Sequence, residues 1–407
     1  MPHFVAISIT NPMYPVLTLV RGKEANVIHR HPWIFSGALA TKPDALHDGA
    51  IVRVADERGR ILGTGTWSRR SSIAVRIFEF GEAELDRSWF ARRFAEADDR
   101  RRLLGFGPDS PTTGYRVAFG EADGLPGIVV DRFGDVLTLQ LSTAGTEMLR
   151  EAILNALGEV FPGAVIVERS DMPSRREEGL EPRSEVARGQ LAEPVPFLEY
   201  GLKFLADPLT GQKTGFYLDQ RDLRVAIRGL AADRDVLNLF SYTGAAGVAA
   251  LAGGASQVLN VDSSAPALDR CREHAALNGF SADRMATAEA DVFQFLGDER
   301  AERYGMVLLD PPAVIKSQKD AEEGRKAYHF LNRAALRLVE DGGIFVTSSC
   351  SRHLPEEDLA FTLRRASVQA GVRLDLLGAV RQAADHPLSV YFPESFYLKS
   401  FICRVRR

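Results

Sequence analysis

The chain has 407 residues, of which 45% are hydrophobic and 26% are charged. This length is too great for one hydrophobic core and predicts two or three domains. The composition is that of an ordinary globular protein and excludes a disordered or fibrous chain. The formal net charge of −4 conceals a basic N-terminal part, because residues 1–80 hold ten Lys and Arg against six Asp and Glu. Such a surplus suits a polyanionic partner, but a solvated surface explains it equally well.

The cysteine spacing and the lengths of the apolar runs indicate the cellular compartment in which the protein is expected to work. Cys271, Cys350 and Cys403 are far apart and form no CxxC pair, which argues against a disulfide framework and a structural zinc site. No apolar run reaches the roughly 18–20 residues that a membrane span needs, and the N-terminus has no signal-peptide pattern. We therefore expect a cytoplasmic protein with no bound metal and no membrane partner.

Residues 16–80 are predicted to form a small β-barrel, because short apolar runs alternate with turn clusters. Within this part, the segment RHPWIFSG interleaves basic and aromatic groups, among them Arg30, His31 and Trp33. Groups interleaved in this way can stack on bases and contact phosphate. A barrel core with a polar turn has the same pattern, so the residues alone leave RNA contact open.

The middle of the chain is predicted to be a helix followed by a small α+β unit. Apolar residues recur at helical spacing over residues 82–104. Residues 114–168 contain strand-like runs and one amphipathic helix. Residues 168–194 are polar, with proline, glycine and charge throughout, so we expect a long loop and a domain boundary there.

From residue 235 onward, strand-like runs alternate with helical stretches, which is the pattern of an α/β domain. Four of the runs end on a polar or reactive residue: Asp262, Asp291, Asp310 and Cys350. The carboxyl ends of parallel strands share one edge of an open sheet, and ligands bind in the crevice beside that edge. The sequence therefore predicts a ligand site built from these four residues.

Three further elements are expected around this sheet. Residues 211–224, GQKTGFYLDQRDLR, precede its first strand and suit either a flap over a cofactor or a loop that caps the next helix. A helix is predicted over residues 327–341, stopping at Gly342 and Gly343. Residues 389–407 are predicted to form two strands joined by a short turn.

The turn FSYTGAAG, which follows the first strand of the sheet, is a candidate cofactor site. Its small residues let the backbone approach a ligand, and the helix that follows offers free N–H groups. The GxGxxG fingerprint is absent, which makes a nicotinamide-dependent oxidoreductase a remote alternative. A methyltransferase needs only that the turn admit the methionine part of S-adenosylmethionine. Asp262 then suits the ribose hydroxyls and Asp291 the adenine amine, although either residue alone could simply end a strand.

Asp310-Pro311-Pro312 and Cys350 carry the candidate chemistry. Paired prolines after a strand make a stiff, extended lip, where the Asp310 carboxylate can accept a hydrogen bond from an amine on a flat base. Motifs of this class occur in methyltransferases that act on planar nitrogen groups and on cytosine. The C5 atom of cytosine becomes nucleophilic only after a thiolate adds to C6, and Cys350 can supply that thiolate. A buried structural cysteine remains the alternative.

Taken together, these motifs resemble the ribosomal RNA large-subunit methyltransferase I type family. Its members are S-adenosylmethionine-dependent cytosine-C5 methyltransferases with an N-terminal PUA domain. The similarity covers nearly the whole chain and is carried by RHPWIFSG, EADGLPGIVVDRFGD, GQKTGFYLDQRDLR, LNLFSYTG, LDPP, SSCS and FPESFYLK.

The resemblance implies an α/β protein of three domains. A PUA domain, which binds structured RNA in this family, would occupy residues 1–80 and a central α+β domain residues 81–195. A Rossmann-like class I methyltransferase domain would fill residues 196–407. The implied partner is 23S ribosomal RNA, and a homodimer is compatible with the family.

The resemblance also implies the site residues. Cys350 would be the nucleophile, and Asp310 would orient the cytosine. Gln220 and Arg221 would reach over the cofactor. The cofactor pocket would be lined by Phe240, Ser241, Tyr242, Thr243, Gly244, Asp262, Asp291 and Asp310, and the RNA contacts would be Arg30, His31, Trp33 and Lys316.

The chain departs from related patterns at two positions. Many RNA cytosine-C5 methyltransferases carry a second cysteine after the motif proline, where this chain has Ala313. The base that removes the C5 proton is therefore unassigned, with Lys316 or a water as candidates. Family members often place an aromatic residue where this chain has Val314.

Two alternatives stay open. The first is methylation of an exocyclic base amine with Cys350 structural, although such motifs usually have an aromatic residue at the position of Ala313. The second is a non-catalytic RNA-binding protein that retains the fold.

Overall fold

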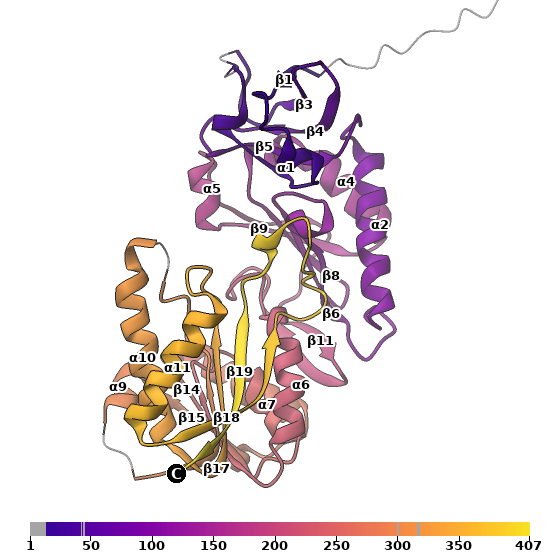
Figure 1. Cartoon of the computed structure of the whole chain (residues 1–407). Helices are drawn as coiled ribbons and strands as arrows, with labels where there is room; N and C mark the ends of the chain where they lie inside the picture. Colours follow the sequence, from indigo (N-terminus) through magenta and orange to yellow (C-terminus); the bar gives the residue numbers. More distant parts are fainter. Residues whose placement is uncertain (1–13, 42, 44, 299–300, 316–317) are drawn as a thin grey trace, which may run out of the picture.

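The computed structural model of the chain describes residues 14–41, 43, 45–298, 301–315 and 318–407. Three sheet-containing units follow one another along the molecule, with the N-terminal unit (indigo) at one end and the C-terminal unit (rose through orange to yellow) at the other (Figure 1). No helix within these residues is long and apolar enough to cross a membrane.

The N-terminal unit is a five-stranded sheet in the order β1-β3-β4-β5-β2. Alternate residues of its strands, such as Val52 and Val54, are fully buried in one apolar core, as expected where one face of a sheet is covered. Its elements are β1 (Val16–Thr18), α1 (Ala25–Ile28), β2 (Trp33–Phe35), β3 (Ile51–Ala55), β4 (Ile61–Trp67) and β5 (Ile73–Glu79).

The middle unit is a second five-stranded sheet, ordered β10-β9-β8-β7-β6 and covered by helices. Helix α2 (Arg87–Leu103) starts at Asp86, whose side chain accepts a hydrogen bond from Trp89 N, and this bears out the helix expected over residues 82–104. The other elements are β6 (Gly114–Phe119), β7 (Ile128–Phe133), β8 (Val136–Leu141), α3 (Ala144–Met148), α4 (Arg150–Val160), β9 (Val165–Ser170), α5 (Pro173–Glu177) and β10 (Arg183–Arg188).

The long loop expected over residues 168–194 is wrong, because this stretch holds the end of β9, α5 and β10. Strand β10 pairs antiparallel with β9 at the edge of the sheet, and most of its side chains are exposed. An edge strand that buries little apolar surface has no reason to show an apolar pattern. Its polar sequence was therefore indistinguishable from that of a loop.

The C-terminal unit is a seven-stranded sheet in the order β15-β14-β13-β16-β17-β19-β18, preceded by the hairpin β11-β12. Strands β13 to β17 are parallel, whereas β19 runs antiparallel between β17 and β18. The strands are β11 (Val195–Glu199), β12 (Leu202–Ala206), β13 (Asp235–Leu239), β14 (Gln257–Asp262), β15 (Met285–Glu289), β16 (Tyr304–Leu309), β17 (Val339–Ser349), β18 (Arg373–Arg381) and β19 (Lys399–Arg406).

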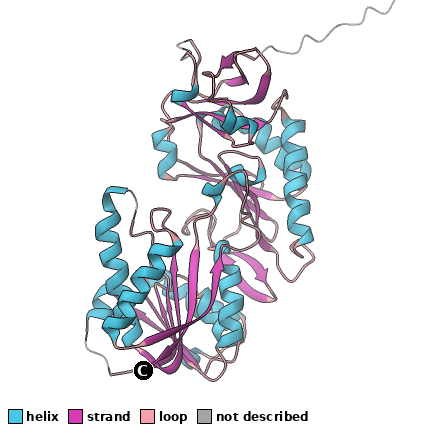
Figure 2. Cartoon of the chain, in the orientation of Figure 1, coloured by secondary structure: helices cyan, strands magenta, loops and turns pink. Residues whose placement is uncertain are grey.

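Helices cover both faces of this sheet (Figure 2). Val236, Met306 and Ile344 are in register on neighbouring strands and belong to the core shared with α6, α7 and α8. The next residues along, which include Leu237 and Phe345, belong to the core shared with α9, α10 and α11. Continuous apolar strands are what a parallel sheet covered on both faces requires. The helices are α6 (Arg221–Leu230), α7 (Ala245–Ala252), α8 (Ala265–Leu277), α9 (Val292–Gly297), α10 (Ala321–Arg337) and α11 (Glu356–Ala370).

Two predicted boundaries in this unit are wrong. Helix α10 ends at Arg337, before Gly342 and Gly343, because Val339 already pairs with Tyr304 of β16. Residues 389–407 form one strand, β19, preceded by turns, and the partner of β19 is the unpredicted β18. In both cases the observed boundary is set by pairing with a strand that is distant in the sequence.

Candidate active site

The turn after β13 is strained in the way a ligand-binding turn often is. Phe240 and Tyr242 adopt φ values of 58° and 48°, and Gly244, at the start of α7, has φ 73°. A Cβ atom on Gly244 would lie 2.2 Å from the sulfur of Cys271, so only glycine fits there. The carbonyl of Thr243 accepts a hydrogen bond from His274 Nδ1 at 2.9 Å, which fixes the turn against α8.

Asp262 is the last residue of β14, and Asp291 follows the neighbouring strand β15. The carboxylate of Asp262 accepts hydrogen bonds from Tyr242 N at 2.8 Å and Ser264 N at 3.0 Å. Asp291 caps α9 by accepting from Gln294 N, and its side chain is exposed. Each oxygen of Asp262 keeps a second lone pair, so these structural contacts leave room for ribose hydroxyls.

The chemical groups of this turn suit S-adenosylmethionine. Among the described residues, Ser241 Oγ is buried without a hydrogen-bond partner, and such an orphan is unfavourable unless a ligand satisfies it. The turn is packed tightly against Cys271 at Gly244, and the backbone-anchored carboxylate of Asp262 completes a cradle of the right chemistry. Phe240 lines the same turn, with its ring 6.2 Å from that of Phe293.

Asp310 and Cys350 stand at the ends of two adjacent parallel strands, β16 and β17. Oδ2 of Asp310 accepts a hydrogen bond from Gln220 Nε2 at 2.7 Å. Burial, together with the nearby carboxylate of Asp219, raises the pKa of Asp310 to about 6. Cys350 is half-buried, and burial together with the Asp310 charge raises the pKa of its thiol, while the Lys213 ammonium opposes that shift.

A polar cluster beside this pair was missed by the sequence reasoning. Lys213 Nζ donates to Asp219 Oδ2 at 2.7 Å, and Tyr397 Oη donates to the same oxygen at 2.6 Å. Although burial favours the neutral acid, these partners hold the pKa of Asp219 well below its usual range. Lys213 also lies 4.1 Å from the centre of the Tyr217 ring. The motif GQKTGFYLDQRDLR pointed to this segment, but nothing marked Asp219 within it.

A second lysine, Lys399, also interacts with Cys350. It begins β19, is almost fully buried, and donates from Nζ to the carbonyl oxygen of Ser351 at 2.5 Å. Burial lowers the pKa of Lys399 to about 8, an effect that the Cys350 charge opposes. Lys399 belongs to the sequence motif FYLK, but nothing in this motif predicts that the lysine lies near Cys350.

The expectation that Arg221 reaches over the cofactor is not what the contacts show. Its guanidinium is fully buried, 2.8 Å from Asp385 Oδ2 and 3.3 Å from Glu199 Oε2. Nη2 donates to the carbonyl oxygen of Gly114 in the middle unit at 2.6 Å. Arg221 therefore links the C-terminal unit to the middle unit, whereas its neighbour Gln220 contacts Asp310 at the end of β16.

The motif RHPWIFSG holds the N-terminal unit to the rest of the chain. His31 Nε2 lies 3.3 Å from Glu394 Oε2, and Trp33 Nε1 donates to Glu121 Oε1 at 2.7 Å. The Trp33 ring also packs edge-on against Phe392 at 4.7 Å. Arg30 is exposed. Lys316 lies outside the described residues.

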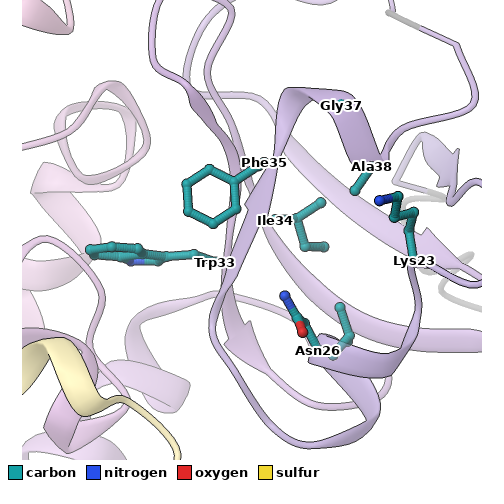
Figure 3. A pocket seen from close by; sticks show the side chains of 8 residues that line it. Lys23, Asn26, Trp33, Ile34, Phe35, Gly37 and Ala38 are labelled. Atoms are coloured by element: carbon teal, nitrogen blue, oxygen red, sulfur yellow. The ribbon is translucent and has the colours of Figure 1, made fainter.

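A cavity of about 270 Å³ is lined by apolar and polar residues of α1, β2 and the segments beside them. Figure 3 shows Ile34 between the Phe35 ring and the Lys23 ammonium. Phe35 is 45% exposed, which is unusual for a large aromatic side chain. The lining residues are Lys23, Asn26, Val27, Trp33, Ile34, Phe35, Gly37 and Ala38.

Comparison with known proteins defines the class first. The S-adenosylmethionine-dependent methyltransferase family matches residues 180–369, and a PUA-like domain matches residues 17–80. A Streptococcus mutans protein described as a SAM-dependent methyltransferase has the same fold, with a TM-score of 0.81 and 23% identity over 96% of this chain and all of that one. SMU.776, described as a methyltransferase complexed with SAH, gives a TM-score of 0.82 at 22% identity, covering 96% of this chain and all of that one. Fold and site thus define a methyltransferase that uses S-adenosylmethionine and carries an N-terminal PUA-like domain.

Sequence relatives define the family within this class. The ribosomal RNA large subunit methyltransferase I of Klebsiella pneumoniae (strain 342) is 39% identical over 403 residues, which cover 98% of this chain and all of the relative. The protein of the same name from Salmonella newport (strain SL254) is 39% identical over 402 residues, covering 97% and 99%. The chain belongs to the ribosomal RNA large subunit methyltransferase I family. The predicted family, fold class and cofactor are confirmed.

Proposed function

We propose that this protein transfers a methyl group from S-adenosylmethionine to C5 of a cytidine in 23S ribosomal RNA, through a covalent bond between Cys350 Sγ and C6 of the base. The observation that carries the proposal is the position of Asp310 and Cys350 at the ends of adjacent strands, on the edge that also holds the turn after β13. The relatives named above support ribosomal RNA of the large subunit as the substrate.

The cofactor, when bound, supplies an electrophilic methyl group on a sulfonium. On the protein side, Ser241, Gly244 and Asp262 hold it beside the strand ends. Cys350 as a thiolate adds to C6, and the electron pair displaced from the C5–C6 double bond makes C5 nucleophilic. After methyl transfer the C5 proton leaves to a base, the double bond re-forms and the C6–S bond breaks. This order of bond formation and cleavage regenerates Cys350 as a thiolate.

Asp310 orients the base in this scheme. With a pKa of about 6, its carboxyl group can accept a hydrogen bond from the cytosine amine and can share a proton with the ring nitrogen beside it. Gln220 donates to one carboxylate oxygen at 2.7 Å, so the other oxygen can accept a hydrogen bond from the base.

The RNA contact on the N-terminal unit is proposed to be the cavity beside α1. Phe35 offers an exposed ring for stacking, and Lys23 and Asn26 offer polar groups at the same opening. Arg30 is exposed and available to phosphate. His31 and Trp33 contribute by holding this unit in place, since their polar atoms are engaged with Glu394 and Glu121.

A second candidate is methylation of an exocyclic base amine with Cys350 structural. The observation that favours it is the raised pKa of the Cys350 thiol, which disfavours the thiolate. The decisive experiment incubates the protein with ribosomal RNA and labelled cofactor and digests the product to nucleosides. Cys350→Ala should abolish 5-methylcytidine while cofactor binding persists, and Cys403→Ala, at a buried cysteine of β19, is the matched control. Normal methylation by Cys350→Ala would refute the covalent mechanism.

Trapping gives a second, independent readout. RNA that carries 5-fluorocytidine at the target should form a stable protein adduct, because fluorine cannot leave as a proton does. The adduct should be absent in Cys350→Ala and present in Cys403→Ala. An adduct on another residue would reassign the nucleophile.

A further inference from the structure

A buried ammonium without an acidic partner lies beside Cys350. Only 4% of Lys399 is exposed. Its Nζ donates to two backbone carbonyl oxygens, of Ser351 at 2.5 Å and of Tyr397 at 3.2 Å. In the part of the chain that the structure describes, no carboxylate forms an ion pair with it.

Such an arrangement is unfavourable in the resting protein. A buried charge loses its hydration, and carbonyl dipoles replace only part of what a carboxylate would return. Burial accordingly lowers the pKa of Lys399 to about 8. An apolar side chain would fill this place at less cost, so the lysine points to a negative charge that arises nearby during function.

Strand pairing brings Lys399 beside the chain neighbours of Cys350, whose thiol can carry that charge. In the antiparallel pair of β17 and β19, Lys399 lies opposite Ser349, and its ammonium reaches the carbonyl of Ser351. The lysine therefore contacts both chain neighbours of Cys350. The thiol of Cys350 and the carboxylate of Glu356 are the acidic groups that act on Lys399.

The other groups around Cys350 come from three further elements. Asp310 follows β16, Tyr328 lies on α10, and Tyr217, Asp219 and Lys213 come from the segment before α6. Asp310 and Asp219 oppose a thiolate, while Lys213 favours one. Lys213 is already paired with Asp219 at 2.7 Å. Lys399, on which the Cys350 thiol acts, has no such ion pair among the described residues.

We propose that Lys399 is the positioning residue that holds Cys350 as a thiolate. As the Sγ–H bond breaks, the proton leaves to water and the electron pair stays on sulfur, so the ammonium of Lys399 compensates the new negative charge. The same ammonium meets the thiolate again when the C6–S bond breaks. The use of this thiolate in methyl transfer rests on the proposed function, whereas the ion pair itself does not.

The test is the rate at which iodoacetamide alkylates Cys350 as a function of pH, followed by peptide mass spectrometry without RNA or cofactor. The pKa values of Cys271 and Cys403 are both raised to about 12 by burial, so these thiols serve as unreactive internal references. Lys399→Met should move the apparent pKa of Cys350 up by at least about one unit and slow alkylation at pH 7.5 about tenfold. Lys399→Arg, which keeps the charge, should restore most of the rate. An unchanged profile in a folded Lys399→Met would overturn the proposal.

The reciprocal measurement does not depend on a lysine variant that folds. Competitive acetylation reports the pKa of Lys399 in the wild type and in Cys350→Ala. Loss of the thiol should lower that pKa further, because an anionic neighbour no longer favours the ammonium, and an unchanged value would refute the pair. Since neither assay involves methyl transfer, a confirmed pair in a protein that makes no 5-methylcytidine would refute the proposed function and leave this inference standing.

Discussion

Gln220 donates a hydrogen bond from its side-chain amide to Asp310 at 2.7 Å, and this contact joins the segment before the sheet to the strand end where substrate is proposed to bind. Gln220 belongs to the short helical turn Leu218–Gln220, in which Asp219 and the nearby Lys213 form the neighbouring ion pair. One short turn thus determines both the orientation of Asp310 and the charge around Cys350.

Replacing Gln220 with alanine should weaken methyl transfer most strongly at low pH. The hydrogen bond favours the ionised carboxylate, so its loss raises the pKa of Asp310 above about 6. The acid limb of the pH profile of kcat/KM should therefore move to higher pH, with roughly a tenfold loss at pH 6.5 and a smaller one at pH 8.5. Gln369→Ala, at an exposed position of α11, is the control. Equal loss at both pH values would indicate a purely structural role.

Asp310→Asn should stabilise the protein at high pH while it impairs catalysis. The folded-state pKa of about 6 lies above the model value of 3.8, so the folded chain binds this proton more tightly than the unfolded chain. The corresponding stability is fully present below pH 3.8 and is lost as pH rises through 6, by at most about 3 kcal/mol. Urea denaturation should show the variant about 1–3 kcal/mol more stable than wild type at pH 8, with no gain at pH 4. Asp135→Asn, at a side chain that is 95% exposed, should show little change at either pH.

Gly244→Ala should lose cofactor binding for a steric reason that a second glycine separates from backbone strain. The new Cβ atom would meet the Cys271 sulfur at 2.2 Å, whereas a Cβ atom on Gly279, with a similar φ of 76°, would meet nothing within 4 Å. We expect Gly279→Ala to cost about 1 kcal/mol of unfolding free energy and Gly244→Ala clearly more. Isothermal titration with the cofactor should show binding only in Gly279→Ala. Retained affinity in Gly244→Ala would mean that the cofactor does not approach this turn.

Phe35→Ala and Trp33→Ala should separate RNA contact from attachment of the N-terminal unit. Removal of the exposed Phe35 ring should weaken RNA binding by about 1–3 kcal/mol, the usual value of one base stack, with little change in stability. Removal of Trp33 takes away the hydrogen bond to Glu121 and the packing on Phe392. Hydrogen exchange should then increase in β2 and in residues 389–396. Unchanged RNA affinity in Phe35→Ala would place the RNA elsewhere.

The sequence predicted the sheet edge well and its surroundings poorly, for identifiable reasons. Asp262, Asp310 and Cys350 could be located because each of them comes at the end of a run of apolar residues that predicts a strand. Lys399 could not, since its position depends on β19 pairing antiparallel with β17, which no local pattern encodes. Arg221 was assigned with Gln220 because they are adjacent in sequence. Successive residues of a helix point about 100° apart, however, and Arg221 begins α6 pointing into the middle unit.

The same limit applies to the RNA-contact residues. Trp33 and His31 carry the aromatic and basic chemistry of a nucleic-acid surface, yet they face Phe392 and Glu394, which are distant in sequence. Interfaces between units use the same side chains as interfaces with ligands, so composition alone does not distinguish them. Phe35, two residues from Trp33, is exposed in the fold, and no local sequence pattern distinguishes it from Trp33.

The strand order has a consequence for how the proposed reaction centre forms. Strand β19 lies between β17 and β18 in the sheet, although it comes after both of them in the sequence. Until it inserts between β17 and β18, Cys350 lacks Lys399, and Asp219 lacks Tyr397. The N-terminal and middle units can therefore fold early, but the proposed reaction centre is complete only after β19, which follows the other strands of this sheet in sequence, has been inserted.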